Sequence, residues 1–403
     1  MKLNLILFLS LIIFSFLFLV VFYFQYQHQI RIESDYTLRL VEKQVSNIKP
    51  TNKLNARVFP ITFMSADLEN LFLSRILKSN CQVFLASYYS FNSLGGILPT
   101  FIGKEKKSYI YGHGKKYYIL EQFLNSKSSS YIKDDDFIFF ADGMDVMFYD
   151  NLQRAVEIYI SYLRLEGFDV ERDREKDWPI LFNAEKNRHP FPRNFYQFIK
   201  NLDIKILIEK YVRQQNYPKK PYCAPSTFNF INSGVYIARK RDVKSYLRTI
   251  FEKIVKDPKF LDNDDQGIAH YVHISNSYHP VYPIMTDCNL ALSITTFNSC
   301  EIFRSNDGAT CQVADPINGA RPISIHSAGL GCKQFCPCLS TSVNQSPLSN
   351  SITSTDLHDL KKDFGVIVYD SDHDSITIRP VLEFCGKETL FNIEQDKCVY
   401  KNY

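Results

Sequence analysis

The sequence lacks a strong net charge. Its 47 lysines and arginines and 43 aspartates and glutamates leave a formal charge of only +4, spread over 403 residues. This balance argues against a nucleic-acid-binding surface. Internal repeats are also absent, while the 45% content of apolar residues is ordinary for a globular chain. The length leaves room for one large domain or for two smaller ones.

The N-terminus lacks the small-residue cleavage site that ends a secretory signal. Residues 3–24 form an almost unbroken apolar run without charge, and about 20 such residues span a bilayer. We therefore predict an uncleaved transmembrane signal anchor at 5–24 rather than a cleaved signal. The simplest arrangement is a single-pass type II protein, with a cytoplasmic start at 1–4, a polar stem at 25–55 and a lumenal body.

The cysteines indicate an oxidising compartment. The chain has ten, an even number, and six of them follow residue 305, which is typical of disulfides formed in the lumen of the endoplasmic reticulum or Golgi. Their connectivity stays open. Zinc binding by the CxxxCxC group at 332–338 is an alternative, although a matching second half is missing. A glycosylation sequon, Asn344-Gln345-Ser346, lies in a loop-like stretch.

An acidic turn after a buried strand is the most informative stretch. Residues 137–141 are apolar throughout, as in a strand buried on both faces, and Asp142-Gly143-Met144-Asp145 follows. In open α/β sheets, ligands bind beyond the carboxyl ends of strands, and paired carboxylates there hold hard divalent cations. The alternative is a turn with two solvated acids, because the DxxD pattern is weak by itself.

The spacing of the other elements predicts a parallel, doubly wound α/β sheet. Apolar strands at 58–64, 81–87 and 179–185 alternate with helical periods, and a strand–turn–strand pattern follows at 227–238. The predicted helices cover 68–77, 117–124 and 152–165, and further strands are predicted at 281–292 and 323–326.

Polar residues at the ends of these elements each have two interpretations. Lys116 follows two glycines, and it either approaches a diphosphate or belongs to an exposed basic turn. Asn232 and Ser233 either bind sugar hydroxyls or form an ordinary turn.

Two further candidates are acidic and imidazole groups. Asp264 and Asp265 either cap a helix or direct a carboxylate at a substrate. His326 ends a short strand. A lone histidine is more often structural, but after two distant aspartates it is a candidate third metal ligand.

Beyond the body the composition changes. A stretch rich in serine, threonine and asparagine at 339–355 predicts a linker. Two short strands follow at 366–369 and 375–378. We therefore divide the remaining chain into a body at 56–333 and a small, disulfide-rich C-terminal appendage at 334–403.

Together these stretches resemble the glycosyltransferase module of the procollagen lysyl hydroxylases and collagen glycosyltransferases. The resemblance runs from about residue 58 to 333, most of the predicted body. The motifs that carry it occur in the family's order, and they are FADGMDVMF at 140–148, FNAE at 182–185, FINSGVYIA at 230–238, DNDDQ at 262–266 and the H-x-x-G turn at His326.

The resemblance implies a nucleotide-sugar transferase of the GT-A type, with a doubly wound, mixed but mostly parallel sheet flanked by helices. It implies that Asp142, Asp145 and His326 bind Mn²⁺, with Mg²⁺ as a substitute. The cation would bridge the two phosphates of a UDP-sugar, where charge grows as UDP leaves.

The resemblance also assigns the substrate pocket. Lys116 and Lys333 would lie near the diphosphate and stabilise its growing charge. A carboxylate of Asp264 or Asp265 would position the acceptor hydroxyl or take its proton. The remaining matched positions, which would line the sugar and acceptor pocket, are Glu185, Asn232, Ser233 and Gly234.

The chain departs from the family at several positions. Met144 replaces an aromatic residue that packs on the nucleotide base, His189-Pro190 replaces a tryptophan-containing loop, and Ala328 replaces an asparagine. These changes concern the sugar donor and the collagen acceptor more than the metal site. The family's oxygenase module and its H-x-D pattern are missing, so hydroxylation is not expected.

The expected function is therefore a membrane-anchored glycosyltransferase of the endoplasmic reticulum or Golgi. It would move a hexose from a UDP-sugar to a hydroxyl acceptor, such as hydroxylysine or hydroxylysine-linked galactose of a collagen-like protein. Two alternatives stay open: a catalytically inactive lumenal relative that binds glycans or proteins, and a metal-dependent hydrolase. The sugar, the stereochemical outcome and the oligomeric state are not determined by the sequence.

Overall fold

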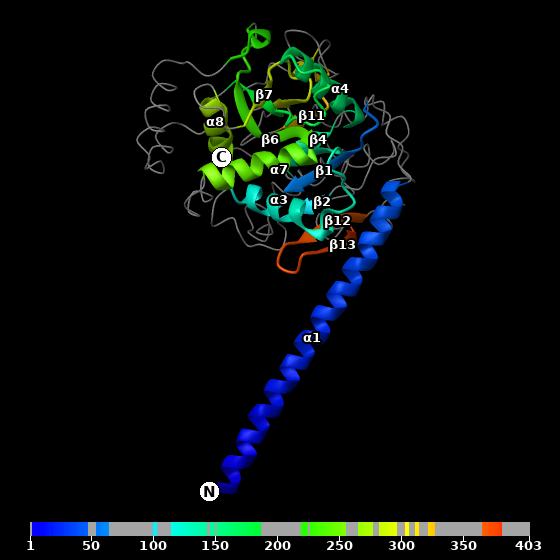
Figure 1. Ribbon diagram of the computed structural model, residues 1–403, viewed down its shortest axis with the longest axis vertical. Helices are drawn as coiled ribbons and strands as arrows, with labels where there is room; N and C mark the ends of the chain where they lie inside the picture. The colour runs from blue at the N-terminus through cyan, green and yellow to red at the C-terminus, as the bar shows by residue number, and fades with distance from the viewer. Residues whose placement is uncertain are drawn as a thin grey trace, which may run out of the picture.

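The computed structural model shows an α/β body from which one long helix, α1, extends (Figure 1). The helices are α1 (Lys2–Ser46), α3 (Lys115–Asn125), α4 (Leu152–Leu165), α7 (Lys240–Thr249) and α8 (Asp265–Asn276), with short turns η2 (Lys127–Ser129), η3 (Pro221–Cys223) and η4 (Ile250–Ile254). The structure describes residues 2–46, 54–63, 100–102, 114–142, 146–148, 150, 152–186, 219–224, 226–254, 265–276, 282–295, 303–305, 311–313, 321–326 and 365–380.

A mixed β-sheet forms the centre of the body, in the order β13-β12-β2-β1-β3-β6-β5-β8-β11-β4, with β7 paired to β5. Strand β6 runs antiparallel to both of its neighbours, β3 and β5. The strands are β1 (Val58–Phe63), β2 (Thr100–Ile102), β3 (Phe137–Asp142), β4 (Val146–Phe148), β5 (Ile180–Glu185), β6 (Phe230–Arg239), β7 (Ile284–Asp287), β8 (Ser293–Thr295), β11 (Ser324–His326), β12 (Gly365–Asp370) and β13 (Ser375–Pro380); β9 (Phe303–Ser305) and β10 (Cys311–Val313) form a separate pair.

Alternate residues of the central strands face two separate apolar layers. In β3, Phe137 and Phe139 pack in the layer that contains α4, whereas Ile138 and Phe140 pack in the layer that contains α3, α7 and α8. All four side chains are fully buried. This confirms that the apolar run before Asp142 is a strand buried on both faces, because each face of the sheet carries helices.

The structure confirms several predicted elements and corrects others. The predicted helix at 152–165 coincides with α4, and the predicted strand at 179–185 corresponds to β5. The strand–turn–strand prediction at 227–238 is wrong, because this stretch continues as the single strand β6. Its irregularity is a register shift opposite β5. The predicted elements at 68–77 and 81–87 lie outside the described residues.

The predicted strand at 281–292 is shorter in the structure, where β7 ends at Asp287. The buried Asp287 carboxylate accepts hydrogen bonds from the backbone N–H groups of Ala291, Leu292 and Ser293. It also accepts one from the Tyr162 hydroxyl at 2.8 Å. These bonds hold the chain in a turn and lead it directly into β8.

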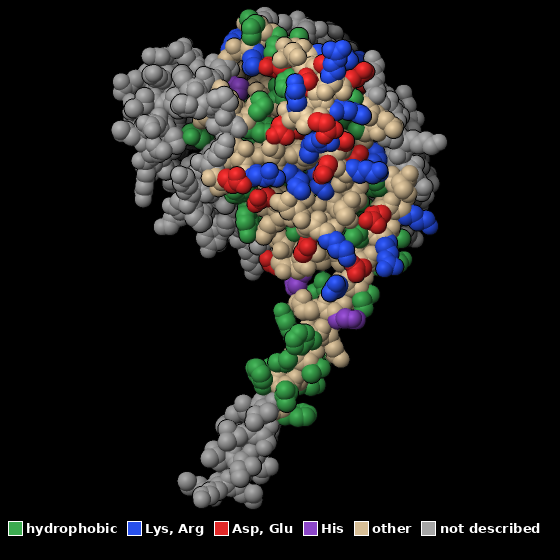
Figure 2. All heavy atoms as spheres, viewed as in Figure 1, with side chains coloured by type: hydrophobic (Ala, Val, Ile, Leu, Met, Phe, Trp, Pro, Cys, Tyr) green, Lys and Arg blue, Asp and Glu red, His purple; other side chains and the backbone are tan. Residues whose placement is uncertain are grey.

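The N-terminal segment differs from its prediction. None of the helices in the described part of the chain is long and apolar enough to cross a membrane, which overturns the predicted transmembrane helix at 5–24. Exposed apolar side chains, such as Phe18 and Phe22, surround the middle of α1 (Figure 2).

The stretch at 25–55, which was predicted as a polar stem, is helical as far as Ser46, because α1 continues through it. The last turns of α1 belong to the body, since Leu38, Val41 and Val45 are buried in the same apolar layer as α3. These three residues recur at helical spacing, a signal that the interpretation of the stretch as a polar stem did not use.

The C-terminal strands are part of the main sheet and not a separate appendage. β12 pairs in parallel with β2, placing Ile367 opposite Thr100 and Val368 opposite Phe101. The backbone N–H of Ile376 in β13 donates to the Ser34 hydroxyl of α1 at 3.0 Å. Residues 365–380 therefore close one side of the fold, while Cys385 and Cys398 lie outside the described residues.

One disulfide connects Cys223 in η3 to Cys288, directly after β7. It joins positions 65 residues apart in the sequence. Beside it, the Ser226 hydroxyl donates to the backbone carbonyl of Cys288 at 2.7 Å. The bond therefore fixes the segment that precedes β6 against the end of β7.

Replacing both Cys223 and Cys288 by serine should lower the free energy of unfolding by about 2–4 kcal/mol, because the closed loop restricts the unfolded chain. Urea unfolding of the oxidised protein and of the double variant measures the difference. Dithiothreitol should destabilise the wild type more than the double variant, because only the wild type has the Cys223–Cys288 bond to lose. Equal stability of the two proteins would contradict a structural role for the bond.

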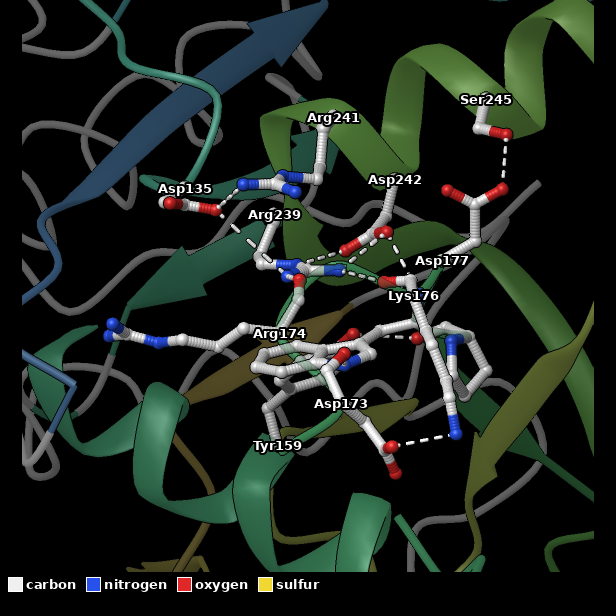
Figure 3. A network of polar contacts seen from close by, with 12 residues as sticks. Asp135, Tyr159, Asp173, Arg174, Lys176, Asp177, Arg239, Arg241, Asp242 and Ser245 are labelled. Atoms are coloured by element: carbon white, nitrogen blue, oxygen red, sulfur yellow. Dashed lines mark hydrogen bonds and ion pairs between the residues drawn. The ribbon is translucent and has the colours of Figure 1, made fainter. Parts of the chain in front are cut away.

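A buried ion pair fixes the other end of β6 (Figure 3). The Arg239 guanidinium donates to Asp242 at 2.6 Å and lies over the Trp178 ring, with 3.7 Å between the guanidinium carbon and the ring centroid. It also donates to the backbone carbonyls of Arg174 and Lys176. Arg239 and Asp242 are 2% and 0% exposed, so each charge depends on the other.

Asp242→Ala should lower the free energy of unfolding by about 3–5 kcal/mol, because it leaves a buried guanidinium without its carboxylate. The matched control is Ser245→Ala on the same helix, whose hydroxyl makes an exposed hydrogen bond to Asp177. That change should stay within about 0.5 kcal/mol of the wild type. Urea titrations followed by circular dichroism test both, and comparable losses would contradict the assignment.

Candidate functional site

The candidate site lies at one edge of the sheet, where several strands end. Asp142 is the last residue of β3, Glu185 the last of β5 and His326 the last of β11. β3 and β5 run in the same direction, because both are antiparallel to β6, and β5, β8 and β11 are mutually parallel. The carboxyl ends of these strands therefore meet at one edge, where open α/β sheets bind ligands.

Lys116 is at the centre of the polar contacts. Its ammonium donates to the Asp142 carboxylate at 3.0 Å and forms a second ion pair with Asp265. The backbone carbonyl of Ser233 is 3.4 Å away, and the Ser233 hydroxyl donates to Asp265. Residues from α3, β3, β6 and α8 therefore meet around one buried positive charge, which excludes the prediction of an exposed basic turn.

The electrostatics of this cluster favour a charged lysine. Burial by itself lowers the pKa of Lys116, but the carboxylates of Asp142 and Asp265 more than offset it and raise the pKa above its ordinary value. The Lys116 side chain is 4% exposed, compared with 8% for Asp265 and 29% for Asp142. The pair with Asp265 is thus enclosed, and the pair with Asp142 is partly open.

A second group of contacts holds Glu185. Gln266, the second residue of α8, donates its side-chain amide to one carboxylate oxygen, and Asn232 donates to the other at 3.3 Å. The side-chain carbonyl oxygen of Asn232 accepts a hydrogen bond from the backbone N–H of Gly234 at 2.9 Å. Glu185 is buried, so these amides orient a carboxylate that faces the same edge as Lys116.

His326 lies against the backbone of Gly234. A Cβ atom at position 234 would be 2.1 Å from Cε1 and 2.7 Å from Nε2 of the His326 ring, so glycine is required there. Since Val235 pairs with Ala141 in β3, the imidazole and Asp142 both approach the same short stretch of β6. In addition, His326 pairs with Val146, the residue that follows Asp145.

A buried amide–hydroxyl pair lies beneath the site. Asn183 in β5 donates to the Thr295 hydroxyl at 2.8 Å, and both side chains are fully buried. Thr295 pairs with His326 in the sheet, and Asn183 pairs with Asn232. The residues predicted for the site did not include Asn183, Thr295 or Gln266, although Asn183 and Gln266 lie inside the FNAE and DNDDQ motifs.

The structure places all eight predicted site residues that it describes at this edge of the sheet, and they are Lys116, Asp142, Glu185, Asn232, Ser233, Gly234, Asp265 and His326. Asp145, Asp264 and Lys333 lie outside the described residues. Within the described ranges, no group of three or more histidine, cysteine, aspartate or glutamate side chains is arranged to hold a metal ion. The metal set predicted from the sequence includes Asp145 and stays a prediction.

Comparison with known proteins adds no family assignment: no protein-family model matches the chain, and no curated protein matches it.

Gly234→Ala should destabilise the protein by about 1–3 kcal/mol, because the new methyl group overlaps the His326 ring. The same change should cost less than about 0.5 kcal/mol in a His326→Ala background, where the ring is gone. Urea unfolding of the four proteins in this cycle measures the coupling. An equal cost in both backgrounds would show that the ring does not lie on Gly234.

Proposed function

We propose that the protein is a metal-dependent glycosyltransferase that moves a hexose from a UDP-sugar to a hydroxyl acceptor. The observation that carries this proposal is the convergence of Lys116, Asp142 and Asp265 at the carboxyl edge of the sheet. An ammonium between two carboxylates, on separate elements, suits a site that must handle a cation, a pyrophosphate and an acceptor hydroxyl at once.

The residues present fit a hard divalent cation. Asp142 supplies carboxylate oxygens and is partly open, and His326 supplies imidazole nitrogen beside the same segment of β6. Together with Asp145, which lies outside the described residues, they would provide two carboxylates and one imidazole, a donor set that suits Mn²⁺ and also accepts Mg²⁺. A cation held by these residues would supply positive charge against the charge that develops on the phosphates as UDP leaves.

The chain's own residues take distinct roles in this proposal. Lys116 and Lys333 hold positive charge near the diphosphate. Asn232, Ser233 and Gly234 line the sugar pocket with amide, hydroxyl and backbone groups. The carboxylates of Glu185, Asp264 and Asp265 position the acceptor hydroxyl, and one of them takes its proton as the new bond forms.

The acceptor and compartment follow from the same proposal. We infer a protein or glycan hydroxyl as the acceptor, with hydroxylysine or galactosyl-hydroxylysine of a collagen-like protein as the first to test. The disulfide between Cys223 and Cys288 supports an oxidising compartment such as the lumen of the endoplasmic reticulum or Golgi.

The test is a screen of UDP-sugars with the full-length protein, with and without Mn²⁺ and collagen-like peptides. Asp142→Asn should reduce Mn²⁺-dependent turnover at least about 100-fold, a loss of about 2.7 kcal/mol of transition-state stabilisation. The matched control, Asp169→Asn in an exposed turn, should retain wild-type turnover.

The outcomes separate the alternatives. Sugar transfer that requires both Mn²⁺ and an acceptor supports the proposal. Release of UDP that is unaffected by any acceptor would instead indicate a metal-dependent hydrolase. A folded protein that turns over no UDP-sugar, yet binds glycans or proteins equally well after Asp142→Asn, would indicate an inactive binding relative.

A further inference from the structure

We propose that Lys116 is a built-in counter-cation that occupies Asp142 while the divalent cation is absent, and that it opposes binding of that cation. This inference rests on the proposed metal site and adds a regulating residue to it. It follows from one feature: the Lys116 ammonium lies 3.0 Å from the Asp142 carboxylate, which is also the proposed metal ligand.

The surroundings of Lys116 show which contact exchanges. Asp265 is enclosed and is also bonded by the Ser233 hydroxyl, whereas Asp142 is 29% exposed. An entering cation therefore reaches Asp142 first. The ammonium that leaves Asp142 keeps Asp265, the Ser233 carbonyl at 3.4 Å and the Phe140 ring at 5.6 Å from its centroid. Lys116 thus gives up one contact of four without becoming an isolated buried charge.

The same arrangement explains how the acids stay together without a metal. Asp142 ends β3 and Asp265 begins α8, and their negative charges would repel each other across the site. The ammonium between them offsets that repulsion. This preassembly also makes Lys116 compete with the divalent cation, because a carboxylate oxygen that accepts a hydrogen bond from Lys116 is less available to the cation.

The inference predicts opposite effects for two substitutions. Lys116→Met removes the competing charge and should tighten Mn²⁺ binding at least about tenfold, equivalent to about 1.4 kcal/mol. Asp265→Asn removes the alternative partner of Lys116, commits the ammonium to Asp142, and should weaken Mn²⁺ binding several-fold.

The experiment measures free Mn²⁺ by electron paramagnetic resonance during titration of the full-length proteins, without any sugar donor. Lys186→Met is the matched control, because it removes the charge of a lysine whose ammonium lies over the Phe228 ring and is not paired with Asp142. It should change Mn²⁺ affinity less than threefold. Thermal unfolding gives a second readout: Lys116→Met should melt lower than the wild type without Mn²⁺ and gain more from its addition.

The results distinguish failure of this inference from failure of the proposed function. If the wild type binds Mn²⁺ and Lys116→Met binds it with equal or lower affinity, the counter-cation role alone is overturned. Equal tightening in Lys116→Met and Lys186→Met would also overturn it, in favour of a general charge effect. Absence of Mn²⁺ binding in every variant would overturn the metal site itself. If Lys116→Met does not fold, tighter binding by Asp265→Asn would overturn the inference, and weaker binding would support it.

Discussion

The rest of the site depends on one electrostatic constraint: a buried ammonium must stay close to carboxylates. Lys116 reaches Asp142 and Asp265 only because α3, β3 and α8 end or begin at the same edge of the sheet. A lysine buried without such partners would lose its charge or unfold the region. The ion pairs therefore fix the positions of α3, β3 and α8 relative to one another. They also concentrate charge at the edge of the sheet where a substrate would bind.

Strand β6 connects this constraint to the rest of the fold. It lies between β3 and β5, and its first half supplies Asn232, Ser233 and the Gly234 surface under His326. Its last residue, Arg239, is fixed by its ion pair with Asp242 of α7. The site end and the anchored end are thus parts of one strand. Rigid placement of this kind is what a pocket for a charged donor requires, because small displacements weaken electrostatic stabilisation.

The local elements of the site were predictable from the sequence pattern, and the family resemblance placed its residues in one pocket, but the contacts between those residues were not predictable. The apolar run before Asp142 predicted a strand buried on both faces. The prediction is correct because helices cover both faces of the sheet. The pairing of Lys116 with Asp265 joins residues far apart in the chain, and no local pattern encodes it. The close approach of His326 to Gly234 depends on strand order, which periodicity does not reveal. The path of α1 was missed because its buried residues, Leu38, Val41 and Val45, lie in an otherwise polar stretch.

The proposed function requires that Asp142, Asp145 and His326 share one cation that holds a pyrophosphate. The most direct measurement is a crystal structure of the full-length protein with Mn²⁺ and UDP, using anomalous scattering to locate manganese. We expect a single anomalous peak in contact with Asp142, Asp145 and His326, with the UDP phosphates bound to it and Lys116 shifted from Asp142 toward Asp265. A peak elsewhere, or UDP bound away from this edge of the sheet, would contradict it.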